Sequence, residues 1–131
     1  MWPAHEAHDL VQRWFARNSR HGWATCPFTQ AGFVRIVSNP AFSPDAVSPG
    51  EALALLEANI GTAEHHFWRD EVSVADAVKS FRAQLVGYRQ VTDAYLLGLS
   101  IRKAGRLATL DRSVISLLHG KNGDRIVIIE E

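Results

Sequence analysis

Two aspartates in the second half of the sequence have positions that could build one metal site. Asp111 directly follows a short strand-like run at 106–110, and Asp93 begins the apolar segment that leads into this strand. Ligands gather at the carboxyl ends of parallel strands, and a helix of about 12 residues would bring its first turn back to that end. Two carboxylates converging there suit a hard cation such as Mg²⁺ or Mn²⁺. Such a cation would activate water and neutralise charge on a phosphodiester.

The same two aspartates also have a purely structural interpretation. An acidic residue in the first turn of a helix interacts favourably with the helix dipole, which would keep the Asp93 carboxylate ionised. Asp111 precedes a short apolar segment and could serve as the N-cap of a helix there. Spacing alone favours these structural roles over a metal site.

Helical and strand-like segments alternate along the chain, which predicts an α/β fold with a mainly parallel sheet. Periodicity and end signals indicate helices over 4–17, 30–37, 49–59, 75–85, 93–103 and 113–118. Short apolar runs indicate strands over 23–26, 65–68, 106–110 and 125–129, with a turn at Asn122–Gly123 before the last one. Ser48 and Glu51 are expected to form a capping box, while Thr29 and Thr92 are expected to be simple N-caps.

Bulk composition narrows the class of protein. A chain of 131 residues suits one domain. Its 14 basic and 14 acidic residues give no net charge, so any contact with nucleic acid must come from a local patch. The single cysteine, Cys26, excludes an internal disulfide and is typical of a reducing cytoplasm. No apolar run approaches the ~18 residues that span a bilayer, and the first residues do not resemble a signal peptide.

Three segments resemble the PIN domains of VapC-type toxins. The segment RQVTDAYLLGLSIRKAGRLATLDR, at 89–112, is similar to the late part of those domains, where a helix opens with T-D-A-Y-L and a strand ends in T-x-D-R. The segment ATCPFTQAGFVRIVSNP, at 24–40, resembles their second strand and following helix, and SPGEALALLEA, at 48–58, resembles the next helix. Together these segments extend the resemblance over nearly the whole chain.

The resemblance implies a three-layer PIN fold, with a mainly parallel sheet flanked by helices, and a Mg²⁺- or Mn²⁺-dependent endoribonuclease. It also implies an RNA substrate, a cognate antitoxin protein that holds the toxin inactive, a homodimer and a cytoplasmic location without a membrane anchor. The alternative is an interaction protein, in which a PIN-like domain with a degenerate site binds the antitoxin and cuts nothing.

The family's acidic site has four positions, and the resemblance assigns three of them here. Asp93 matches the third and Asp111 the fourth. Gln30 occupies the second, where an amide is a poorer ligand than a carboxylate for a hard cation. The first lies on an opening strand with a pattern like L-D-x-N-x-L, which this sequence does not contain. We therefore expect 1–131 to be a single PIN domain that lacks its first strand, with further residues upstream of Met1.

Three further side chains have open roles. Arg112, next to Asp111, could contact an RNA phosphate or pair with a neighbouring carboxylate, and the sequence does not choose between these. His65 and His66 would point to opposite faces of a strand, so packing is favoured over a shared metal. Trp23 is expected in the core rather than as a platform for bases.

Overall fold

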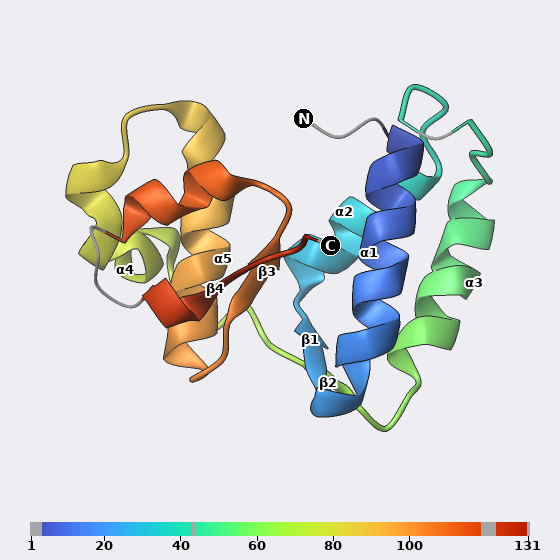
Figure 1. Cartoon of the computed structure of the whole chain (residues 1–131), viewed down its shortest axis with the longest axis horizontal. Helices are drawn as coiled ribbons and strands as arrows, with labels where there is room; N and C mark the ends of the chain where they lie inside the picture. The colour runs from blue at the N-terminus through green and yellow to red at the C-terminus, as the bar shows by residue number, and fades with distance from the viewer. Residues whose placement is uncertain (1–3, 43, 119–122, 131) are drawn as a thin grey trace. The chain divides into compact units, whose positions relative to one another are not determined.

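The computed structural model describes residues 4–42, 44–118 and 123–130 (Figure 1). The chain divides after Asp70 into two compact units, each of which is described by itself. Asn122 lies outside the described residues, and so does the turn expected there. No helix in the described ranges is long and apolar enough to cross a membrane.

The described residues of the first unit form three α-helices and a pair of parallel strands. Its elements are α1 (Ala4–Asn18), a 3₁₀ turn η1 (Ser19–His21), β1 (Trp23–Thr25), α2 (Pro27–Val37), α3 (Pro49–Ile60) and β2 (His65–Phe67). Strand β1 pairs with β2 in a parallel register that sets Trp23 beside His65 and Thr25 beside Phe67. Helices α2 and α3 form the connection between the two strands and pack against each other.

Capping chemistry sets where α2 and α3 begin. The capping box of α3 is confirmed: the Glu51 N–H donates to Ser48 Oγ at 3.1 Å, and the Ser48 N–H donates to Glu51 Oε1 at 3.3 Å. The expected start of α2 at residue 30 is wrong, because the helix begins at Pro27. Proline suits the first helical position. The Thr29 hydroxyl then bonds the backbone N–H and carbonyl of Cys26, at 2.9 and 3.0 Å, from inside the first turn.

The second unit is built around one buried helix, α5 (Val91–Arg102). The other elements are α4 (Val74–Val78), β3 (Leu107–Thr109), β4 (Ile126–Ile128) and four 3₁₀ segments: η2 (Lys79–Gln84), η3 (Tyr88–Gln90), η4 (Arg112–Leu117) and η5 (Gly123–Arg125). The strands β3 and β4 are parallel, with Leu107 beside Ile126 and Thr109 beside Ile128. The core of this unit consists of Phe81, Ala94, Leu97, Val114, Leu117, Leu118 and Ile126.

Two helix expectations in the second unit are corrected. The helix expected over 75–85 divides into α4 and the tighter η2. Helix α5 begins at Val91 rather than Asp93, and Gln90 at its N-cap makes no side-chain capping bond. Because η3 runs directly into α5, Thr92 already lies inside the helix and is not its cap. Asp93 thus belongs to the first turn.

Close packing holds α4 against α5. A Cβ atom added at Gly98, which is buried in α5, would lie 2.0 Å from the carbonyl oxygen of Ala77 in α4. Only glycine fits this contact, so the two backbones meet directly. The contact fixes the position of α5, the helix that carries Asp93.

The α/β class is confirmed, with parallel strands interleaved with helices. The described strands form a two-stranded sheet within each unit. The opening strand that the family resemblance implies stays a prediction.

Candidate active site

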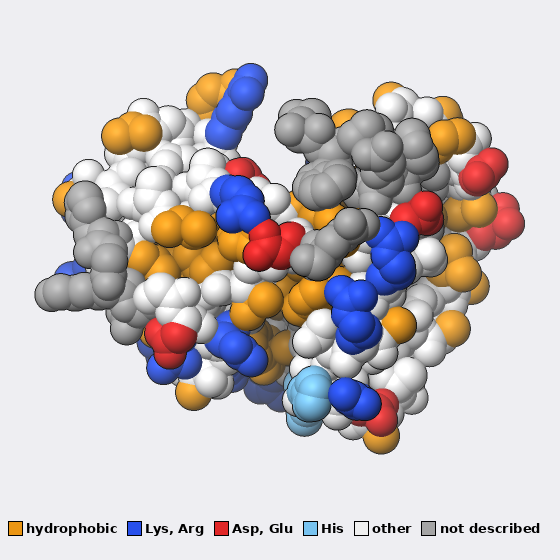
Figure 2. Space-filling model, in the orientation of Figure 1, with side chains coloured by type: hydrophobic (Ala, Val, Ile, Leu, Met, Phe, Trp, Pro, Cys, Tyr) orange, Lys and Arg blue, Asp and Glu red, His pale blue; other side chains and the backbone are white. Residues whose placement is uncertain are grey.

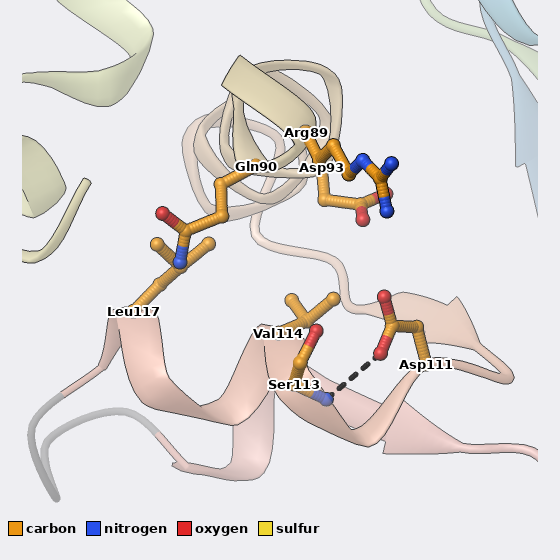
Figure 3. Close-up of a pocket in the computed structure, with 7 residues that line it drawn as sticks. All are labelled: Arg89, Gln90, Asp93, Asp111, Ser113, Val114 and Leu117. Atoms are coloured by element: carbon orange, nitrogen blue, oxygen red, sulfur yellow. Dashed lines mark hydrogen bonds between the residues drawn. The ribbon is translucent and has the colours of Figure 1, made fainter. Parts of the chain in front are cut away.

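The structure brings Asp93 and Asp111 to one pocket in the second unit (Figure 3). The pocket has a volume of about 250 Å³. Its lining residues are Arg89, Gln90, Asp93, Asp111, Ser113, Val114 and Leu117. Asp93 comes from the first turn of α5, and Asp111 comes from the segment between β3 and η4. The start of a helix and the end of a strand meet here, as the spacing of the two aspartates predicts.

Asp111 caps η4 and faces the pocket at the same time. One of its carboxylate oxygens, Oδ1, accepts the N–H of Ser113 at 2.9 Å, so the expected N-cap role is confirmed. The Asp111 N–H in turn donates to Thr109 Oγ1 at 3.1 Å. The second carboxylate oxygen points toward Asp93 (Figure 3). Capping therefore fixes the side chain and leaves one oxygen for a ligand.

Hydrogen bonding and burial shift the two carboxyl groups in opposite directions. Hydrogen bonds from the Ser113 side chain and backbone lower the pKa of Asp111. Burial raises the pKa of Asp93, and the negative charge of Asp111 raises it further. We expected the helix dipole to favour the ionised form of Asp93, but burial and the neighbouring charge outweigh it. The Asp93 carboxylate makes no hydrogen bond or ion pair with any residue that the structure describes.

This pair of carboxylates has the chemistry of a site for a hard cation. Its donors are oxygens, and the Coulomb repulsion that raises the pKa of Asp93 is relieved by a positive ion between the two groups. Across the described ranges, no group of three or more histidine, cysteine or acidic side chains gathers to hold a metal. Two carboxylates would leave most positions around the cation to water and phosphate oxygens.

Three polar pocket residues were not singled out in the sequence: Arg89, Gln90 and Ser113. Arg89 lies three positions before the T-D-A-Y-L segment, but nothing in its local spacing marks it as a site residue. The charged residue that the sequence did single out, Arg112, forms an ion pair with Glu130 and does not line the pocket. Its geometry thus matches the pairing alternative.

Gln30 belongs to the first unit, where it takes part in a short chain of polar contacts. Its Nε2 donates to Thr25 Oγ1 at 3.0 Å, and the same hydroxyl lies 2.7 Å from Nε2 of His65. The His65 ring packs against Trp23 with centroids 4.6 Å apart, and Trp23 also meets Phe15 edge-on at 4.9 Å. Burial, followed by the charge of His66, lowers the pKa of His65. His65 and Trp23 therefore pack against each other within the unit, and Trp23 is partly buried rather than part of the fully buried core.

In an α/β protein, two aspartates facing one pocket have the donor chemistry of a site for a divalent cation, and such a cation suits work on phosphate esters. No family model matches the chain. Curated relatives from Mycobacterium tuberculosis do match. Ribonuclease VapC38 of strain ATCC 25618 / H37Rv is 43% identical over 116 residues, which cover 88% of this chain and 80% of the relative. Ribonuclease VapC39 of strain CDC 1551 / Oshkosh is 41% identical over 113 residues, covering 86% of this chain and 81% of the relative.

A third relative, ribonuclease VapC44 of strain CDC 1551 / Oshkosh, is 39% identical over 110 residues, covering 84% of this chain and 77% of the relative. Identity at this level over most of both chains shows common descent. The chain belongs to the VapC ribonuclease family.

Proposed function

We propose that this protein is the ribonuclease toxin of a VapBC-type toxin–antitoxin system and cuts RNA by metal-dependent hydrolysis. The main observation behind this proposal is that Asp93 and Asp111 face one pocket, where burial and mutual repulsion raise the pKa of Asp93. Membership of the VapC ribonuclease family supplies the reaction class. On the face drawn in Figure 2, each unit shows Lys and Arg side chains interspersed with acidic and apolar ones.

The two aspartates would hold Mg²⁺ or Mn²⁺. When bound, such a cation activates water and offsets charge on the phosphodiester. Asp111 keeps a fixed rotamer through its bond to Ser113, and Asp93 presents its carboxylate from the rigid first turn of α5. Water attacks phosphorus and the 3′-oxygen of the preceding nucleotide leaves. The products are a 3′-hydroxyl and a 5′-phosphate.

Gln30, in the first unit, occupies the sequence position where the family resemblance implies an acid. The donation from Gln30 Nε2 to Thr25 leaves Oε1 to accept a hydrogen bond or contact a cation. An amide oxygen carries no net charge, so we expect weaker binding of divalent ions than a carboxylate would give. Arg112 remains a candidate phosphate contact if its pair with Glu130 opens on RNA binding.

The partners follow from the same proposal. They are an RNA substrate, a cognate antitoxin and a second copy of the chain, all in the cytoplasm.

The decisive experiment is cleavage of total RNA by the purified protein with Mg²⁺ or Mn²⁺. Asp93→Ala serves as the inactive control. Cleavage that needs a divalent ion and Asp93 supports the proposal. A folded protein that leaves RNA intact with both metals contradicts it.

One observation favours a second candidate function, a PIN-like domain that binds an antitoxin and cuts nothing. Gln30 stands where an acid is expected, and among the described residues that line the pocket two carry a carboxylate. For this candidate, the antitoxin would co-purify with the protein while RNA stays uncut. Such a protein would also keep its antitoxin when Asp93 is replaced.

A further inference from the structure

The loop at 86–90 presents an exposed ring and a cation beside the aspartate pocket. The side chain of Tyr88 is 81% exposed and that of Val86 is 90% exposed. Arg89, between Tyr88 and the helix, lines the pocket together with Asp93 and Asp111. Arg89 and Asp93 both come from the segment where η3 runs into α5, and both are drawn among the lining residues in Figure 3.

Internal hydrogen bonds give this loop a defined shape. The Gln90 side chain turns back on it, and its Oε1 accepts the N–H of Val86 at 2.7 Å and the N–H of Gly87 at 3.2 Å. The Gln90 N–H donates to the Gly87 carbonyl at 3.1 Å. The exposed ring is therefore held by ordered backbone rather than by a loose segment.

Tyr88 and Arg89 also contact each other. Arg89 Nε donates to the Tyr88 hydroxyl at 3.4 Å, and the guanidinium carbon lies 5.8 Å from the centre of the ring. This arrangement places a cation next to an exposed aromatic ring. Arg89 makes no ion pair with a described residue, so its charge remains available to an anion.

We propose that Tyr88 and Arg89 form a binding site for single-stranded RNA next to the aspartate pocket. The ring of Tyr88 stacks on a base. Arg89 contacts the phosphate next to that base, on the side of the pocket. Single-stranded RNA carries both groups in alternation, and its bases are free to stack, whereas those of a duplex are not. Arg89 also offsets the repulsion that the two aspartates exert on a phosphate. The choice of RNA as the occupant rests on the proposed function.

The test measures binding apart from cleavage. A short, fluorescein-labelled single-stranded RNA of mixed sequence is titrated with the full chain in EDTA, and binding is followed by fluorescence anisotropy. The same strand annealed to its complement is the second probe. We expect the single strand to bind more tightly. Tyr88→Ala should weaken its binding by about tenfold, within the range of one base–aromatic stack, and Tyr88→Phe should restore it.

Arg89→Ala should weaken single-strand binding and reduce the slope of log affinity against log salt by about 0.7, the value for one phosphate contact on a single strand. Arg89→Lys should keep most of that slope. Matched controls are Phe42→Ala, which removes another exposed ring, and Arg106→Ala, which removes another exposed arginine. Both should bind RNA like the unchanged protein, and circular dichroism checks that every variant is folded.

Three outcomes overturn the proposal. They are equal binding of single and double strands, unchanged RNA binding by Tyr88→Ala, and loss of antitoxin binding by Tyr88→Ala while RNA binding persists. The last would assign the loop to a protein partner. A protein that binds RNA through Tyr88 but cuts none would keep this site and contradict the nuclease function alone.

Discussion

Asp93 and Asp111 face one pocket, where burial raises the pKa of Asp93 and the charge of Asp111 raises it further. One oxygen of Asp111 is held by the Ser113 N–H, so its charge stays near Asp93 instead of turning away. The two groups therefore repel each other in the folded protein. Binding of a divalent cation would relieve this repulsion, which is the physical basis of the proposed site.

Replacing Asp93 should remove activity and stabilise the fold. Because the folded-state pKa of Asp93 is raised above 3.8, the carboxyl group costs stability as the pH rises above 3.8, and the full cost is reached above the folded-state pKa. Below about 3.8 the group is protonated in both states and the cost disappears. Asp93→Asn should thus raise the melting temperature at pH 7, with a difference that shrinks in acid. Thermal unfolding over a pH series measures it, with Asp45→Asn as the control.

A lower melting temperature for Asp93→Asn at pH 7 would contradict the repulsion.

Two replacements of Asp111 should separate its charge from its capping bond. Asparagine is a good N-cap, so Asp111→Asn should keep the stability of η4 while losing metal-dependent cleavage. Asp111→Ala loses the cap as well and should cost about 1 kcal/mol in the free energy of unfolding. Denaturant titration and RNA cleavage are measured on both. Full activity of Asp111→Asn would exclude Asp111 as a ligand.

The same variant tests the coupling of the two carboxyl groups. Removing the charge at Asp111 should lower the pKa of Asp93 toward its ordinary value, although burial will still hold it above that value. Carboxyl carbon NMR of Asp93 follows this directly. No change in the Asp93 titration would show that the two carboxylates do not interact.

Gln30→Glu should strengthen divalent binding and also raise the pKa of His65. The new carboxylate would face Thr25, whose hydroxyl lies 2.7 Å from His65 Nε2, and a negative charge there favours the protonated ring. Calorimetry with Mn²⁺ measures the first effect, and proton NMR of the His65 ring measures the second. Gln30→Ala is the control for loss of the amide. Stronger metal binding without a shift of His65 would contradict the Gln30–Thr25–His65 contacts.

Gly98→Ala should destabilise the second unit, because the added methyl group would lie 2.0 Å from the Ala77 carbonyl oxygen. Overpacking of this kind costs about 1–3 kcal/mol. The matched control is Gly32→Ala in α2, where a Cβ meets nothing within 4 Å. That change should stabilise the helix by about 0.5–1 kcal/mol. Urea unfolding of both variants compares them, and equal stabilities would contradict the close contact of α4 with α5.

The sequence by itself determined the features that depend on neighbours along the chain. The capping box of α3 is a contact between Ser48 and Glu51, three residues apart, and it was predicted. Asp111 as the cap of η4 is equally local. The alternation of helices and strands, and the T-D-A-Y-L and T-L-D-R segments, were enough for the α/β class and the family. They also indicated that Asp93 and Asp111 would meet.

Only the tertiary structure decided which charged side chains line the pocket. Arg112 lies next to Asp111 in sequence, yet it pairs with Glu130. The parallel pairing of β3 with β4 brings that carboxylate close from 18 residues away. Arg89 reaches the pocket instead because η3 runs into α5 without a break. The raised pKa of Asp93 likewise depends on burial and on a charge from another element, neither of which is a property of its local sequence.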